Sequence, residues 1–134
     1  MPVGNRRCDH LALKVKDLER TIAFYRDYVG MQIIHDRRER EHRVVWMRLP
    51  DDLQGLILVM IEDATPASPG GGSVDHLGIH VDNRAEVDAI AERAAAVGIL
   101  IEPPQYAGPV VGYFCTIRDP DGNAVEFSCE QMRL

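Results

Sequence analysis

A seven-residue segment that occurs twice constrains this sequence more than any other feature. Residues 9–15 read Asp-His-Leu-Ala-Leu-Lys-Val, and residues 75–81, 66 positions later, read Asp-His-Leu-Gly-Ile-His-Val. Self-similarity at a fixed period is typical of a duplicated structural unit. We therefore expect two copies of one module in a chain of 134 residues, which is the length of one ordinary domain.

The same order of predicted elements follows each copy. Apolar residues at helix spacing come first, and each helical pattern ends at a glycine, Gly30 or Gly98, the residue preferred for a left-handed C-terminal cap. Strand-like runs follow at residues 31–34, 43–49 and 53–61 in the first copy and at 99–101, 110–118 and 124–129 in the second. The predicted fold class is α+β, with two tandem βαβββ modules.

A segment rich in proline, glycine and serine separates the two copies. Residues 63–73 have the composition of a linker, so module one is expected at about residues 6–62 and module two at about residues 74–131. A module of about 60 residues would leave one sheet face uncovered. We therefore expect both modules to pack together as a single domain over residues 1–134.

Composition argues against several classes of function. The formal net charge is −6, and the arginine-rich stretch at residues 37–43 is interrupted by Glu39 and Glu41, so no nucleic-acid partner is expected. No apolar run approaches the roughly 18 residues that span a bilayer, so no membrane association is expected. Three widely spaced cysteines and the lack of an N-terminal signal segment favour the cytoplasm.

Alternation of side chains along the strands predicts that both repeated histidines and one glutamate face the same way. His10 and His76 alternate with apolar residues that should pack beneath the helices. In the last strand Val125 and Phe127 form the packing side, which puts Glu126 on the histidine side. An unpaired carboxylate in so apolar a strand is unfavourable by several kcal/mol, so it needs a cation, an arginine or a shared proton.

A divalent metal ion is the interpretation that these three residues favour together. Taken singly, a strand histidine is more often a hydrogen-bonded core or surface residue, and a glutamate can simply form an ion pair. The duplication and the matched facing favour a set of two imidazoles and one carboxylate, which suits Fe, Mn, Co, Ni or Zn. The predicted metal ligands are His10, His76 and Glu126.

The third strand of each module supplies candidate residues for a substrate pocket. The same alternation places one set of side chains on the histidine side, and the candidates are His42, Trp46, Arg48, Phe114 and Thr116. Core positions for Trp46 and Phe114 and a surface position for Arg48 are equal alternatives. The catalytic residue is not identified, although His80, on the same face as His76, is one candidate base.

These residues resemble the vicinal oxygen chelate superfamily, which groups glyoxalases, bleomycin-resistance proteins, fosfomycin-resistance enzymes, epimerases and extradiol dioxygenases. The resemblance covers residues 6–131 and rests on both repeat segments and on residues 119–127, Asp-Pro-Asp-Gly-Asn-Ala-Val-Glu-Phe. It implies sheets that curve into a half-barrel around one metal ion, with the three predicted ligands at the family's ligand positions. A homodimer is a further expectation by analogy.

The sequence departs from individual members of that superfamily. Glyoxalase I generally takes a fourth ligand from the last strand of module one, where Val59 stands here, and Glu62 falls on the opposite strand face. Ring-cleaving dioxygenases typically add a histidine and a tyrosine near the metal, and by spacing those positions fall near Ile61 and Thr116. The lysine- and arginine-rich clamp expected of a fosfomycin-resistance enzyme is missing.

Two functions follow from the resemblance and from these departures. The first is a divalent-metal-dependent enzyme that acts on a small oxygen-chelating substrate, with isomerase or lyase chemistry favoured over ring-cleaving dioxygenase chemistry. The alternative is a non-catalytic protein that sequesters a drug, with Trp46 and Phe114 as aromatic walls. Metal content of the purified protein separates the two functions.

Overall fold

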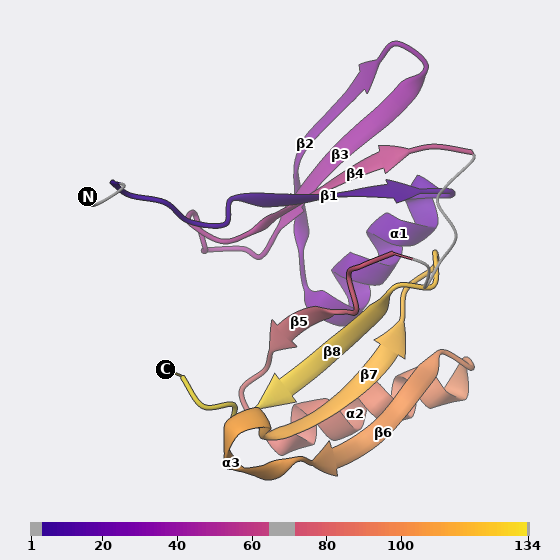
Figure 1. The fold of residues 1–134 in the computed structure, drawn as a ribbon. Coiled ribbons are helices and arrows are strands. Elements are labelled where there is room, and N and C mark those ends of the chain that lie inside the picture. Colours follow the sequence, from indigo (N-terminus) through magenta and orange to yellow (C-terminus); the bar gives the residue numbers. More distant parts are fainter. Residues whose placement is uncertain (1–3, 65–71, 134) are drawn as a thin grey trace. The chain divides into compact units, whose positions relative to one another are not determined.

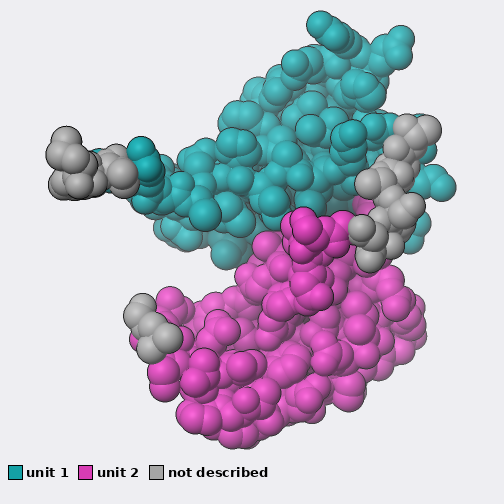
Figure 2. Space-filling model, in the orientation of Figure 1, with its two compact units in different colours: residues 1–66 teal, residues 67–134 magenta. Residues whose placement is uncertain are grey.

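The computed structural model of this chain describes residues 4–64 and 72–133. The chain divides into two compact units, residues 1–66 and 67–134 (Figure 2). Each unit contains one copy of the sequence repeat and forms its own sheet. Most of the expected linker, residues 63–73, lies outside the described residues.

Unit 1 is a four-stranded sheet with one helix. Its elements are β1 (His10–Val15), α1 (Leu18–Phe24), the π-helical turn η1 (Tyr25–Val29), β2 (Gln32–Glu39), β3 (His42–Arg48) and β4 (Ile57–Glu62). The strand order is β1-β4-β3-β2 (Figure 1). Strand β1 is parallel to β4, and the other neighbouring strands are antiparallel.

Unit 2 repeats this order with one additional helix. Its elements are β5 (Leu77–His80), α2 (Arg84–Ala96), β6 (Leu100–Tyr106), α3 (Gly108–Val111), β7 (Tyr113–Arg118) and β8 (Ala124–Cys129). The strand order β5-β8-β7-β6 corresponds strand by strand to that of unit 1, with the first and last strands again parallel. The predicted α+β class with two tandem βαβββ modules is therefore confirmed.

Local sequence signals explain where the helices begin and end. The side chains of Asp17 and Asn83 cap the first turns of α1 and α2 by accepting backbone hydrogen bonds. Gly30 and Gly98 follow the helical segments with φ angles of 85° and 76°, the left-handed conformation that the sequence predicted for both helix ends. Within the described residues, no helix is long and apolar enough to cross a membrane.

The strand predicted to start at residue 110 begins at Tyr113 instead. Gly108–Val111 forms the short helix α3, because the fixed φ of Pro109 suits the first turn of a helix. Gly112 then turns the chain with a φ of 81°, and a Cβ at this position would collide with the Cys129 carbonyl oxygen. The prediction of a strand over residues 110–112 was therefore wrong.

Each unit has a buried core on the helix side of its sheet. Helix α1 contacts β4, and α2 contacts β6, β7 and β8. Side chains that are fully buried include Val15, Leu18, Val45, Met47, Leu58 and Met60 in unit 1, and Val87, Ala94, Ile117, Val125 and Phe127 in unit 2. On β1, His10 and Lys14 are exposed whereas Val15 is buried. The repeated histidine is thus on the side away from the core, as the alternation predicted.

Candidate functional site

The two units present equivalent positions on the exposed face of their sheets. In unit 2, Gly78 on β5 pairs with Glu126 on β8, and in unit 1, Ala12 on β1 pairs with Val59 on β4. Ala12 and Gly78 each stand two residues after the repeated histidine. Val59, which the sequence placed at the ligand position in the last strand of module one, is therefore the counterpart of Glu126.

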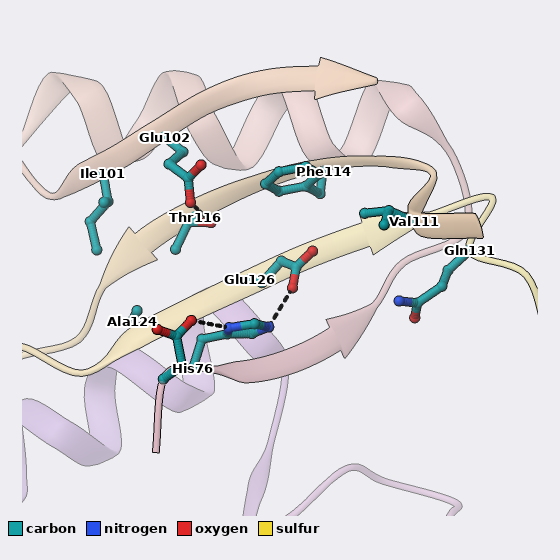
Figure 3. Close-up of a pocket in the computed structure, with 10 residues that line it drawn as sticks. His76, Ile101, Glu102, Val111, Phe114, Thr116, Ala124, Glu126 and Gln131 are labelled. Carbon is teal, nitrogen blue, oxygen red and sulfur yellow. Dashed lines mark hydrogen bonds and ion pairs between the residues drawn. The ribbon is translucent and has the colours of Figure 1, made fainter. Parts of the chain in front are cut away.

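His76 and Glu126, two of the predicted metal ligands, meet in unit 2. Nε2 of His76 lies 2.8 Å from Oε2 of Glu126 (Figure 3). The Glu126 side chain is 14% exposed and that of His76 is 42% exposed, so the carboxylate is the more buried partner. On the other side of the ring, Nδ1 of His76 lies 2.7 Å from a carboxylate oxygen of Asp75. The imidazole is held between two carboxylates.

Unit 1 repeats the contact between aspartate and histidine. Nδ1 of His10 lies 3.1 Å from a carboxylate oxygen of Asp9. A carboxylate that accepts the Nδ1 proton leaves the lone pair on Nε2, and this partner is usual for histidines that bind metal ions. An aspartate precedes the histidine in both copies of the repeat. The sequence carries that signal, but only the contact reveals its role.

The charges around His76 raise the pKa of its imidazole. The hydrogen bond with Asp75 is the largest cause, burial acts in the opposite direction, and the negative charge of Glu126 raises the pKa further. Both carboxylates therefore favour positive charge at this ring. Either a proton or a metal ion at Nε2 supplies it.

The donor atoms of unit 2 fit a divalent metal ion. Nitrogen and oxygen ligands bind such ions at about 2.0–2.2 Å, so that two neighbouring ligands of one ion stand about 3 Å apart. The 2.8 Å between His76 Nε2 and Glu126 Oε2 matches this separation. No three His, Cys, Asp or Glu side chains form a complete metal site within residues 4–64 and 72–133. The third predicted ligand, His10, belongs to unit 1.

A hollow of about 530 Å³ adjoins the His76–Glu126 pair on the sheet face of unit 2 (Figure 3). Its volume lies in the range of about 300–1,000 Å³ that small-molecule sites occupy. Two of the predicted pocket residues, Phe114 and Thr116, line it. The remaining walls are formed by Asp75, Ile101, Glu102, Val111, Ala124 and Gln131.

A second hollow of about 280 Å³ also adjoins the pair and includes the candidate base His80. Gly78 on β5, between His76 and His80 in the sequence, lines this hollow as well. A Cβ added at Gly78 would meet no atom within 4 Å. The space above this position is therefore open, and a larger side chain there would enter the hollow without disturbing the core.

Glu102 is a residue of the larger hollow that the sequence did not predict. Leu100 pairs with Ile117 and Glu102 pairs with Thr116, so Ile101 is an extra residue that forms a β-bulge. The bulge allows Ile101 and Glu102 to line the same hollow, which strict alternation of side chains excludes. Oγ1 of Thr116 donates a hydrogen bond of 3.1 Å to Oε1 of Glu102.

Unit 1 has a smaller hollow of about 230 Å³ beside His10. It is lined by Asp9, His10, Ala12, Arg37, Trp46, Ile57 and Val59. Trp46, a predicted pocket residue, lies against the His35 ring, with 5.0 Å between centroids, and beneath the Arg37 guanidinium at 5.6 Å. Its Nε1 is buried and has no hydrogen-bond partner in the described part of the chain.

His42 and Arg48, the other predicted pocket residues of unit 1, make local contacts and do not line that hollow. Nδ1 of His42 lies 2.9 Å from the carbonyl oxygen of Glu62, and Arg48 donates a hydrogen bond of 3.4 Å to the Leu53 carbonyl. The Glu62 carboxylate accepts a hydrogen bond from the backbone nitrogen of Leu18 at the start of α1. Glu62 thus faces the helix side, as its strand position predicted.

Comparisons with known proteins agree on sequence and fold. Residues 7–127 match the model of the Glyoxalase/Bleomycin resistance protein/Dioxygenase superfamily. An uncharacterized protein of Pseudomonas aeruginosa is 42% identical over 122 residues, 91% of this chain and 87% of that protein. A probable lactoylglutathione lyase of Vibrio parahaemolyticus is 30% identical over 131 residues, 92% of this chain and 91% of that protein. Among solved structures, the chain is similar to a glyoxylase/bleomycin resistance protein/dioxygenase domain from Frankia sp. EAN1pec. The TM-score is 0.75 at 23% sequence identity, and the superposition covers 92% of this chain and 97% of that domain. This similarity shows a shared fold.

Proposed function

Because the chain belongs to the Glyoxalase/Bleomycin resistance protein/Dioxygenase superfamily, we propose that it is a divalent-metal-dependent enzyme that acts on a small oxygen-chelating substrate by isomerase or lyase chemistry. The observation that carries this proposal is the His76–Glu126 donor pair at 2.8 Å, with Asp75 on the far side of the ring. We assign His10, whose Nδ1 contacts Asp9, as the third ligand. The metal is one of Fe, Mn, Co, Ni or Zn.

Each residue of the site has a distinct task in this proposal. Two neutral imidazoles and one carboxylate would hold the ion and leave room for two oxygens of a substrate. The ion would supply a Lewis acid that stabilises negative charge on those oxygens. Asp75 keeps the His76 ring oriented, and Phe114 and Val111 provide apolar walls that hold the carbon part of the substrate.

Isomerase or lyase chemistry is favoured over ring cleavage for two reasons. The relative from Vibrio parahaemolyticus is named a probable lactoylglutathione lyase, and the similarity covers most of both chains. Ring-cleaving members of the superfamily typically use a histidine and a tyrosine near the metal, where this chain has Ile61 and Thr116. Thr116 has another partner, since it donates a hydrogen bond to Glu102.

Elemental analysis of protein purified without added metal tests the proposal directly. One equivalent of a divalent metal per chain is expected, together with its loss in His76→Ala. Formation of S-lactoylglutathione from methylglyoxal and glutathione by the metal-loaded protein then tests the lyase chemistry suggested by the relative. A protein that binds no divalent metal from any of the five candidates would sink the enzymatic proposal.

Drug sequestration without turnover is the second candidate, and the hollow of unit 1 favours it. Trp46 is the only tryptophan of the chain and lines this hollow beneath Arg37, a pairing that suits a planar aromatic ligand. Quenching of its fluorescence by an aromatic drug would measure such binding. Equal affinity with and without metal would favour sequestration, whereas dependence on metal would favour the enzyme.

We also propose that the protein is a cytoplasmic homodimer. The three cysteines are free, which suits a reducing compartment. The dimer is proposed by analogy with the superfamily. Light scattering coupled to size-exclusion chromatography would detect a mass of twice 15.0 kDa, and the monomer mass would contradict the dimer.

A further inference from the structure

Glu102 is a carboxylate in the larger hollow of unit 2 that the proposed function does not use. Glu102 on β6 pairs with Thr116 on β7, which in turn pairs with Glu126 on β8. Side chains at paired positions of neighbouring strands share one face of the sheet. All three side chains line the 530 Å³ hollow, and Figure 3 shows the Glu102 carboxylate pointing to Thr116.

Two uncharged donors orient the Glu102 carboxylate. Thr116 Oγ1 donates to Oε1 at 3.1 Å, and Gln105 Nε2 donates to Oε2 at 3.5 Å. Among the residues that the structure describes, no arginine or lysine forms an ion pair with Glu102. Its negative charge is therefore available to a ligand, and its orientation is set by neutral neighbours.

The charge of the hollow differs from that of the metal ligands alone. With Glu126 as the only carboxylate, a divalent ion would leave a formal charge of +1, which attracts anions. Asp75 and Glu102 also line the hollow, and no arginine or lysine does. The same ion against three carboxylates leaves a formal charge of −1. A neutral or cationic substrate suits this balance better than one with a second anionic group.

We propose that Glu102 determines the substrate specificity of this hollow by binding a hydroxyl or ammonium group of the substrate. The two chelating oxygens of the same substrate would bind at the metal ion beside His76 and Glu126. The inference rests on the proposed function, because it assumes that those oxygens are held by the metal ion. Strands are about 4.8 Å apart, so the Cα atoms of Glu102 and Glu126 stand about 10 Å apart across β7. A small molecule with its donor group a few bonds from the chelating oxygens fills that gap.

The apolar walls of the hollow suit a short carbon chain in the substrate. Ile101, Val111 and Phe114 line the hollow together with its polar groups. In a site of this kind, the apolar walls pack against the carbon atoms of the ligand, and a few polar groups fix the orientation of the ligand. The predicted substrate class is therefore a small amino or hydroxy compound with two adjacent oxygens at one end.

Hydroxamates that share one chelating group test this inference. Acetohydroxamate, glycine hydroxamate and β-alanine hydroxamate would be titrated by calorimetry into the Co(II)-loaded wild-type protein and into the loaded Glu102→Gln variant. The second and third probes add an ammonium group at two distances from the chelating oxygens. For each protein, the affinity of each amino hydroxamate is divided by that of acetohydroxamate. Comparing these ratios between the wild type and Glu102→Gln removes the intrinsic effect of the amine on chelation.

The expected result is a preference of about fivefold for one amino hydroxamate in the wild type, which is modest because Glu102 is exposed and partly screened by solvent. Glu102→Gln should remove the preference and change the acetohydroxamate affinity by less than about twofold. The preference should also shrink as salt is added. An equal preference in both proteins would overturn the inference and leave the metal site standing. Failure of every hydroxamate to bind would overturn the proposed function, and the inference with it.

Two further variants serve as controls. Glu92→Gln makes the same change of charge at an exposed position of α2, so it should keep the preference of the wild type. Thr116→Val removes the hydroxyl that orients Glu102 and should reduce the preference without abolishing it. If Glu92→Gln lost the preference as fully as Glu102→Gln, general charge rather than contact with Glu102 would explain the selectivity.

Discussion

Units 1 and 2 have the same strand order but carry different chemistry at the positions that face their hollows. Val59 in unit 1 stands where unit 2 has Glu126, and Trp46 stands where unit 2 has Thr116, because each of these pairs occupies the same ladder position. Unit 2 therefore presents a carboxylate at its own hollow, and unit 1 presents an aromatic ring at its own. The duplicated fold keeps the positions and changes the side chains that occupy them.

The same comparison extends to the second strand of each unit, β2 and β6. His35 pairs with Trp46 as Glu102 pairs with Thr116, and both strands have a register shift immediately before this residue. A shift at the same place in both units means that the bulge belongs to the module and was not added to one half. The bulge aims whichever side chain stands there onto the exposed face, an imidazole in unit 1 and a carboxylate in unit 2.

The largest expected effect comes from making unit 2 resemble unit 1 at the ligand position. Glu126→Ala should weaken metal binding by more than about 100-fold, since the loss of an outer partner of a ligand alone weakens it by about 10–100-fold. His10→Ala and His76→Ala should act alike. Calorimetric metal titration measures the effect.

Glu62→Ala is the matched control for the loss of a carboxylate. Its carboxylate contacts the backbone of Leu18 on the helix side, so metal content should not change, although helix α1 should become slightly less stable. Full metal occupancy in Glu126→Ala, or loss of metal in Glu62→Ala, would show that the ligand set is wrong.

A smaller effect is expected from the aspartates that contact the histidines. Asp75→Ala and Asp9→Ala should each weaken metal binding by about 10–100-fold, because each histidine loses the carboxylate that orients its ring. The same titration measures both variants. If Asp75→Ala alone has an effect, the two units are not equivalent at the metal and His10 is not a ligand.

A change in the opposite direction gives unit 1 the carboxylate that it lacks. Val59→Glu places a glutamate at the position that corresponds to Glu126. This variant should bind acetohydroxamate about tenfold more weakly, because the new carboxylate would take one coordination position of the metal ion and add negative charge. Val59→Leu is the control for size and should leave the affinity unchanged. An equal loss in both variants would indicate steric blocking of the unit 1 hollow.

The smallest expected effect is that of metal removal on the fold. Each unit has its own buried core, with Leu18 in unit 1 and Phe127 in unit 2 fully enclosed, so chelation should leave the secondary structure intact. Circular dichroism before and after treatment with a strong chelator measures this. Loss of the helical and strand signal on chelation would make the site structural rather than catalytic.

Local sequence patterns were enough to predict several features of the fold. The repeat at residues 9–15 and 75–81 predicted two modules, and Gly30 and Gly98 marked the helix ends. The alternation of side chains also predicted that Glu126 faces the same way as the repeated histidine. These rules work because helix and strand periods are properties of neighbouring residues, so they need no knowledge of the partner strand.

The side chains that line the hollows depend instead on how the strands pair. The bulge at Ile101 brings Glu102 to the face of Thr116, and it exists only in the pairing of β6 with β7. The turn at Gly112 likewise depends on the nearby Cys129 carbonyl oxygen, which is distant in sequence. Register and close approach are properties of two strands at once, and for that reason the alternation within either strand did not predict them.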